Sequence, residues 1–172
     1  MKVLDSIHDR DFLSSPPQTH ANYYDRKAVR AVLIDSAGQV YLMYVGLHGY
    51  HKLPGGGIDQ GEDNFQALTR ELKEEVGCEA VIIRELGEVI EHRDYNATLQ
   101  TSYCYLAQQV GTKHPNELEQ GEIDEQMSEV MAANIDHAIQ LLEADKPDDL
   151  EGRFIQRRDL VFLREAKASM QR

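Results

Sequence analysis

The chain has 172 residues and a formal net charge of −12 at pH 7, with 41% hydrophobic and 28% charged residues. This length and composition predict one domain that is large enough to bury a core. The excess of acidic residues argues against non-specific binding to nucleic acid, which depends on a basic surface. A phosphate-bearing ligand would have to rely on bound metal and a few local cations.

The first 24 residues are expected to form an arm ahead of the core domain, which would span residues 25–172. Met1–Leu13 has no apolar run long enough for a signal peptide, and no segment approaches the length of a membrane span. Ser14–Tyr24 (SSPPQTHANYY) is polar and rich in turn-forming residues. We therefore expect a cytoplasmic protein with no membrane partner.

Two strands joined by a turn open the predicted domain. Ala28–Ile34 (AVRAVLI) and Val40–Val45 (VYLMYV) have the apolar, β-branched composition of strands. Asp35–Gln39 (DSAGQ) lies between them and predicts a hairpin turn. The stretch LPGGG at Leu53–Gly57 follows, and its glycines would let the backbone approach a bound group closely. A tight turn alone is the alternative.

The next predicted element is a helix of about four turns whose two ends are both marked. Asp63 and Gln66 have the spacing of an N-cap residue and its reciprocal partner. Gly77 fits the left-handed residue that closes a helix. Apolar residues recur at helical spacing and predict one buried stripe, made of Phe65, Leu68, Leu72 and Val76.

Glu71, Glu74 and Glu75 share one flank of this helix. Like charges at this spacing destabilise a helix unless a cation neutralises them. Mg²⁺ suits the position because it prefers a few carboxylates together with phosphate oxygens and water. The arrangement therefore predicts a metal site, with a solvated acidic helix face as the alternative.

The second half of the chain predicts further strands and two shorter helices. Strands are expected at 80–83, 86–90 and 99–108, an acidic loop at 111–126, a helix at 135–142 capped by Asn134 or Asp136, a connector at 145–152 and a final helix at 157–170. Cys78 and Cys104 would lie at a helix end and in a strand, and we expect both to be reduced.

Residues 56–78 (GGIDQGEDNFQALTRELKEEVGC) resemble the Nudix box, the signature of the Nudix hydrolases. Every fixed position of the box is present, namely Gly56, Glu62, Arg70, Glu71, Glu74, Glu75 and Gly77. Of the two positions that the family fills with a bulky aliphatic residue, Leu72 conforms and Cys78 is smaller. The resemblance implies an α/β fold, a Nudix-like α/β/α sandwich with a mixed sheet. It also implies a loop-helix-loop box that binds divalent metal and hydrolyses a nucleoside diphosphate linked to another moiety.

The resemblance assigns catalytic and metal-binding roles to Glu71, Glu74 and Glu75, with Mg²⁺ as the cofactor and Mn²⁺ as the alternative. A further metal ligand is expected from the acidic loop, where Glu122 is preferred over Glu119. The general base stays open between Glu71 and an acidic residue of loop 117–125. We expect Glu62 and Arg70 to form a structural pair that positions the loop against the helix.

Candidate substrate-binding residues are Arg30, Lys52, Gly55, Gly56 and Tyr95. The two cations could meet substrate phosphates, and their alternative role is that of ordinary surface charges. Tyr95 lies where dinucleoside polyphosphate hydrolases tend to carry a tyrosine that could stack on a base, although strand packing is its alternative role.

Subgroup signals narrow the substrate only in part. The proline that the ADP-ribose subgroup carries beyond the box is missing from residues 79–114, and the coenzyme A and NADH motifs are not found. Nucleoside triphosphates, oxidised nucleotides and dinucleoside polyphosphates therefore stay open.

Two alternatives to the hydrolase stay open. A nucleotide-sensing module on the same fold would be favoured by loss of box carboxylates, and none is lost. An isomerase would need a catalytic cysteine in the pocket. The N-terminal arm and the final helix are candidate surfaces for a homodimer.

Overall fold

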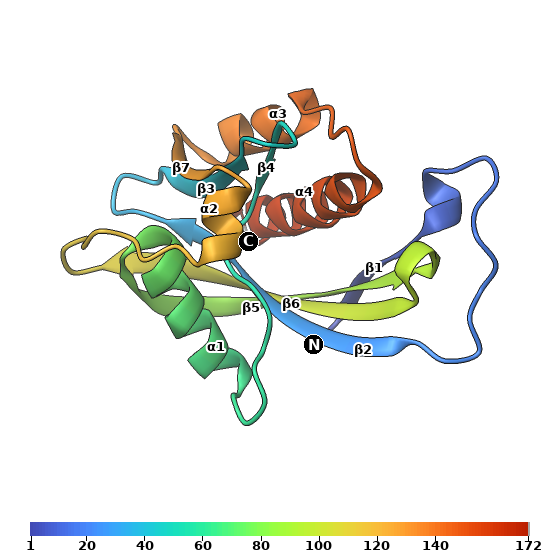
Figure 1. Cartoon of the computed structure of the whole chain (residues 1–172). Coiled ribbons are helices and arrows are strands. Elements are labelled where there is room, and N and C mark those ends of the chain that lie inside the picture. The colour runs from blue at the N-terminus through green and yellow to red at the C-terminus, as the bar shows by residue number, and fades with distance from the viewer. Residues whose placement is uncertain (172) are drawn as a thin grey trace.

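The computed structural model describes residues 1–171 and contains one seven-stranded mixed sheet (Figure 1). The strand order is β1-β5-β6-β2-β3-β4, and β7 pairs with β3. The strands are β1 (Val3–His8), β2 (Tyr24–Ile34), β3 (Val40–Val45), β4 (Tyr50–Lys52), β5 (Glu79–Arg93), β6 (Thr98–Val110) and β7 (Met127–Ala132). The helices are α1 (Asn64–Glu71), continued by a π-helical turn at Leu72–Val76, α2 (Gln120–Asp124), α3 (Ile135–Ala144) and α4 (Leu150–Met170).

The sheet has a long part and a short part that meet at β2 and β3. Strands β2 and β6 run parallel over eleven residue pairs, from Tyr24↔Thr98 to Ile34↔Gln108, and β6 is antiparallel to β5. Strand β2 joins β3 through a single residue pair, Ile34↔Val40. The turn expected at Asp35–Gln39 closes this junction, because Asp35 N–H donates to the Gln39 carbonyl at 3.0 Å.

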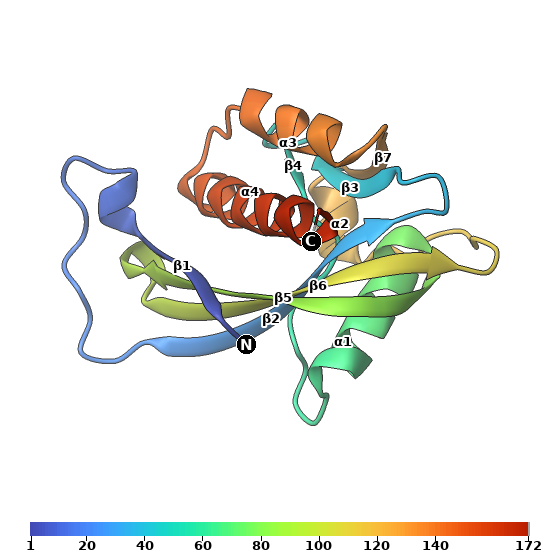
Figure 2. The same cartoon turned by 180° about the vertical axis from the view of Figure 1, so that it is seen from behind.

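Helices cover both faces of the sheet, which confirms the α/β/α sandwich. Helix α1 lies on one face, and α3 and α4 lie on the other (Figures 1 and 2). Strand β2 serves both cores, because Val29 packs with Leu68 of α1 in one cluster and Val32 packs with Phe154 of α4 in the other. Burial on both faces explains why this strand reads as a continuous apolar run.

The box helix begins and ends at the predicted residues. Asp63 accepts hydrogen bonds from the backbone N–H groups of Phe65 and Gln66, and Asp63 N–H donates to the side-chain oxygen of Gln66 at 2.9 Å. Gly77 closes the helix with φ 71°, and a Cβ there would overlap the His114 carbonyl. The prediction of a buried stripe is wrong for one residue, Phe65. Phe65 is 50% exposed because it lies in the first turn, where the helix extends beyond the core.

Part of the expected N-terminal arm belongs to the sheet. Residues 3–8 form β1, which pairs in parallel with β5, and Ile7 is fully buried in the core beneath α4. The polar stretch after the short 3-10 turn at Asp9–Asp11 has no regular structure before β2 begins at Tyr24. The sequence signal was weak because a single edge strand needs only one buried apolar side chain.

Several element bounds also differ from the expectation. The two predicted strands at 80–83 and 86–90 are one strand, β5, with irregularities at Ile82/Arg84 and Glu85/Gly87. Strands β4 and β7 were not predicted, and α4 begins at Leu150 inside the expected connector. Helix α3 is confirmed, with Asn134 as its cap. Both cysteines are free and buried, as expected. Within residues 1–171, no helix combines the length and the apolar character that crossing a membrane requires.

Candidate active site

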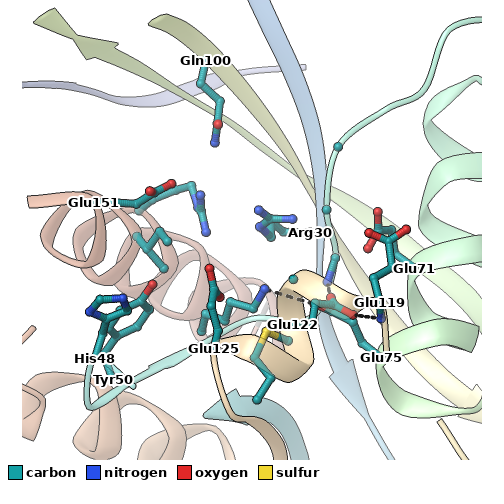
Figure 3. Close-up of a pocket in the computed structure, with 18 of the residues that line it drawn as sticks. Arg30, His48, Tyr50, Glu71, Glu75, Gln100, Glu119, Glu122, Glu125 and Glu151 are labelled. Atoms are coloured by element: carbon teal, nitrogen blue, oxygen red, sulfur yellow. Dashed lines mark hydrogen bonds and ion pairs between the residues drawn. The ribbon is translucent and has the colours of Figure 1, made fainter. Parts of the chain in front are cut away.

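A pocket of about 340 Å³ lies between the box helix, α2 and the first turns of α4. Its lining has an acidic half, made of Glu71, Glu74, Glu75, Glu119 and Glu122, and an arginine half, made of Arg26, Arg30, Arg93 and Arg158. Figure 3 shows Arg30 in the centre, with Glu71 and Glu75 on one side and Glu151 and Gln100 on the other. Lys52, Glu125, Asp149 and Glu151 line the cavity as well, so the two halves differ in which charge predominates.

Three carboxylates converge in the acidic half. One oxygen from each of Glu71, Glu75 and Glu122 lies within 4.8 Å of the other two. Burial, followed by the neighbouring Glu75, raises the pKa of the Glu71 carboxyl. Burial also raises the pKa of Glu122, with Glu75 adding to the effect, to about 7. A cation among these groups would offset the repulsion between the carboxylates.

Arg70 fixes the acidic half to its loop, as the sequence predicted. It binds both oxygens of Glu62, through Nε at 2.9 Å and Nη2 at 3.0 Å. Its Nη1 donates to Glu71 at 2.8 Å and to Glu74 at 3.1 Å, and its Nη2 also donates to the Gly57 carbonyl. Hydrogen bonds from Arg70 lower the pKa of Glu62 to about 2. The Glu62–Arg70 pair is thereby confirmed.

The glycine-rich loop packs directly on these carboxylates. Gly55 N–H donates to Glu75 Oε2 at 2.5 Å, and a Cβ on Gly56 would overlap the Glu71 carboxylate. Lys52 Nζ lies 3.1 Å from Glu75 Oε1, which accepts no hydrogen bond. Glycine at position 56 is therefore required by the close approach of the helix, and Lys52 is the nearest cation to Glu75.

These residues suit a divalent cation. Hard cations such as Mg²⁺ bind carboxylate oxygens, and the acidic half brings three carboxylates together. Glu75 Oε1 is buried, and the Lys52 ammonium lies 3.1 Å from it. The donor set therefore agrees with a metal held by Glu71, Glu75 and Glu122.

The arginine half comes from three elements far apart in the chain. Arg26 and Arg30 lie on β2, Arg93 ends β5, and Arg158 lies on α4. Arg158 is fully buried and Arg30 is 5% exposed. Of these four arginines, only Arg30 was predicted from the sequence to bind substrate.

The structure brings most of the predicted residues to the pocket. Arg30, Lys52, Gly55, Gly56, Glu71, Glu74, Glu75, Glu119 and Glu122 all line it. Tyr95 does not, and this corrects its proposed contact with a base. It lies in the 3-10 turn Asp94–Asn96 with its ring centroid 6.2 Å from that of Phe154, so it packs against α4.

Arg158 was missed although the sequence carried a signal for it. Ile155, Phe162 and Ala166 are buried at helical spacing, and Arg158 lies within that stripe. A charged residue inside an apolar stripe indicates either a buried ion pair or a bound ion. The helix predicted from the sequence began only at residue 157, so it did not include Ile155 and the stripe around Arg158 was not recognised.

A sequence profile of the family described as NUDIX domain matches residues 25–151. The chain therefore belongs to the Nudix family. A relative named RNA pyrophosphohydrolase, from Azorhizobium caulinodans, is 35% identical over 78 residues, which are 41% of this chain and 45% of that protein. This chain thus spans less than half the length of that relative.

Solved structures with little sequence similarity share the fold. A NUDIX hydrolase from Nitrosomonas europaea has a TM-score of 0.63 at 17% identity, covering 85% of this chain and 90% of that one. The ORF135 protein of E. coli has a TM-score of 0.60 at 19% identity, covering 85% and 91%. At such identities the likeness concerns the fold alone.

Proposed function

We propose that the protein is a divalent-metal-dependent pyrophosphohydrolase that uses Mg²⁺, or Mn²⁺ in its place. The observation that carries the proposal is the convergence of Glu71, Glu75 and Glu122 in a pocket that also contains Lys52. A pyrophosphate repels an attacking water because it is densely negative, so its hydrolysis needs positive charge at the phosphate oxygens. Lys52 and a metal held by the three carboxylates would supply that charge.

In this mechanism Glu71, Glu75 and Glu122 would hold the metal, with Glu74 beside them on the same helix. Bound metal would polarise the phosphate oxygens and lower the pKa of a coordinated water. Lys52, 3.1 Å from Glu75, would face the same phosphates. Arg70 would keep Glu71 and Glu74 in place through its two hydrogen bonds.

The general base is proposed to come from the acidic loop rather than from Glu71. Glu71 is 8% exposed and bound to Arg70, so it has little access to a free water. Glu119 and Glu125 line the pocket from the two ends of α2 and are partly or fully exposed. A base must lie within hydrogen-bond reach of the attacking water, which favours these more accessible groups.

Candidate substrates are nucleoside triphosphates, oxidised nucleotides and dinucleoside polyphosphates. The name of the A. caulinodans relative adds RNA as a candidate substrate. The net charge of −12 argues against a long polyanion, because little positive surface would hold it. Small nucleotides, which need only the pocket, are therefore preferred.

The proposal is tested by a screen of these nucleotides with Mg²⁺ and with Mn²⁺, in which released phosphate and pyrophosphate are measured. We expect turnover that EDTA abolishes and that Glu71→Gln lowers strongly. Saturable nucleotide binding without turnover, under every metal condition, would instead support the sensing module. A cytoplasmic location, a single domain that includes β1 as well as residues 25–172, and a homodimer belong to the same proposal, and size-exclusion chromatography with light scattering checks the last.

An isomerase on this fold is disfavoured by the surroundings of the two cysteines. Burial raises the pKa of Cys78 to about 11, and it raises that of Cys104 as well. Neither cysteine lines the pocket. A thiol that stays protonated away from the site is a poor nucleophile.

A further inference from the structure

The arginine half holds more positive charge than its carboxylates neutralise. Four guanidinium groups line it, and the carboxylates paired with them are Glu91, Glu151 and Asp159. Arg93 and Arg158 take all of these partners. Among residues 1–171, no ion pair reaches Arg26 or Arg30, whose known polar partners are the Gln100 amide oxygen and the Val29 carbonyl.

Arg30 is a buried cation with an unused donor. It is 5% exposed, its Nη1 donates to the Val29 carbonyl at 2.9 Å, and its Nε has no hydrogen-bond partner. Burial, followed by the nearby Arg158, lowers its pKa to about 10, so it is still charged at neutral pH. A buried charge without a counter-ion is costly, and a bound anion would offset that cost.

Arg158 has two unused donors at the same wall. Its Nε donates to Asp159 at 2.7 Å, while Nη1 lies 3.6 Å from Glu91 and neither terminal nitrogen makes a hydrogen bond. Asp159 is itself engaged, because its second oxygen accepts from Leu53 N–H at 2.8 Å. The outer edge of the guanidinium is therefore left for a partner from the pocket.

We propose that Arg26, Arg30 and Arg158 form a subsite for a phosphate group additional to the pyrophosphate that is cleaved. Guanidinium groups bind phosphate oxygens in pairs, and phosphate offers enough oxygens for several donors at once. Gln100, whose amide oxygen accepts a hydrogen bond from Arg26, lies on the other side of Arg30 from Glu71 and Glu75 (Figure 3). The cleaved pyrophosphate belongs with the acidic half, so the arginine half serves another group.

This inference rests on the proposed function and narrows its substrate class. The preferred substrate is a pyrophosphate compound with a further phosphate, such as a dinucleoside polyphosphate or a phosphorylated nucleoside diphosphate sugar. An unphosphorylated sugar would leave Arg30 and Arg158 unpaired. An enzyme rejects a compound strongly when binding it would leave buried charged donors without hydrogen-bond partners.

The subsite is tested first without metal or turnover. Inorganic phosphate is titrated in EDTA by calorimetry, with chloride at equal ionic strength as the blank. We expect saturable phosphate binding that Arg30→Gln weakens by about tenfold or more, since one charge-assisted hydrogen bond is worth that much. Arg26→Gln, at a partly exposed position, gives the same test if Arg30→Gln does not fold. Arg164→Gln, an exposed arginine paired with Glu143, is the matched control and should bind like the parent.

The second measurement compares nucleoside diphosphate sugars with and without one phosphomonoester, under Mg²⁺. We expect KM to be about tenfold lower for the phosphorylated compound, and this preference to disappear in Arg26→Gln and Arg30→Gln. Equal KM values in the parent, or phosphate binding in EDTA that neither substitution changes, would overturn the subsite. Failure of the proposed function looks different, because no pyrophosphate would then be hydrolysed while phosphate could still bind in EDTA.

Discussion

The two walls of the pocket are built in different ways. The acidic half takes Glu71, Glu74 and Glu75 from two turns of one helix, and Arg70 on that helix holds two of them. The arginine half takes its members from β2, β5 and α4, and a buried network through Glu91 holds two of them, Arg93 and Arg158. The box carboxylates of the acidic half are therefore fixed by local spacing, whereas Glu119 and Glu122 of that half and the whole arginine half take their places only when the rest of the fold is assembled.

The largest effect is expected on stability, from a substitution in the arginine half. Arg158→Ala removes the cation paired with the buried Asp159 and leaves Glu91 with Arg93 alone, so we expect it to lower the free energy of unfolding by about 3–5 kcal/mol. Urea unfolding measures the loss. Arg164→Ala, 57% exposed, should cost no more than about 1 kcal/mol. Similar costs for the two variants would show that Arg158 is not a tertiary support.

The next effect concerns catalysis in the acidic half. Glu75→Gln keeps the shape of the side chain and removes one negative charge, so we expect kcat to fall by at least ~10²-fold while the fold persists. Steady-state kinetics on the best nucleotide, with circular dichroism as the check on folding, measures this. The control is Glu143→Gln, on the surface of α3. A kcat within about threefold of the parent, only ~0.65 kcal/mol, would contradict the assignment of Glu75.

A smaller effect tests whether metal relieves the crowded carboxylates. Mg²⁺ at ten times its dissociation constant would stabilise the folded state by about 1.4 kcal/mol. For a chain of this size that raises Tm by about 3–6 °C. Differential scanning fluorimetry of EDTA-treated protein, with and without Mg²⁺, measures the shift, and Glu71→Gln should reduce it. Identical melting curves for the parent would count against the metal site.

The smallest effect is expected at Cys78, which belongs to neither wall. It is 2% exposed and packs in the core beneath α1, so Cys78→Val should cost less than about 1.5 kcal/mol and keep most activity. Thermal melts and kcat on the best nucleotide check both statements. Complete loss of turnover in a folded variant would revive a role for the thiol.

Local patterns predicted the parts of the molecule that local forces determine. The cap at Asp63 and the left-handed Gly77 follow from spacing within the box, and both are present in the structure. The Glu62–Arg70 contact, which the resemblance implied, is present as well. Strands β4 and β7 were missed because the first has three residues and both depend on pairing with β3. Pairing with a distant strand leaves little trace in a short sequence.

In the candidate site, too, residues that depend on tertiary contacts were harder to predict than those fixed by local spacing. Glu122 was chosen among several loop carboxylates from the resemblance, and its approach to Glu71 and Glu75 depends on how α2 folds over the box helix. Tyr95 was misjudged because a tyrosine near the expected region says nothing of the direction in which its ring points, and here it packs on Phe154. Arg93 and Arg158 could not be assigned without the tertiary contact of β5 with α4.

Most of helix α4 lies beyond the segment that matches the family. The matched segment stops at residue 151, whereas α4 continues to Met170 and carries Arg158. The box carboxylates, Arg26 and Arg30 all lie within the matched segment, whereas Arg158 of the proposed subsite lies beyond it. Exchanging α4 between family members offers a route to new selectivity, with the condition that Asp159, or an equivalent acceptor for Leu53 N–H, is retained.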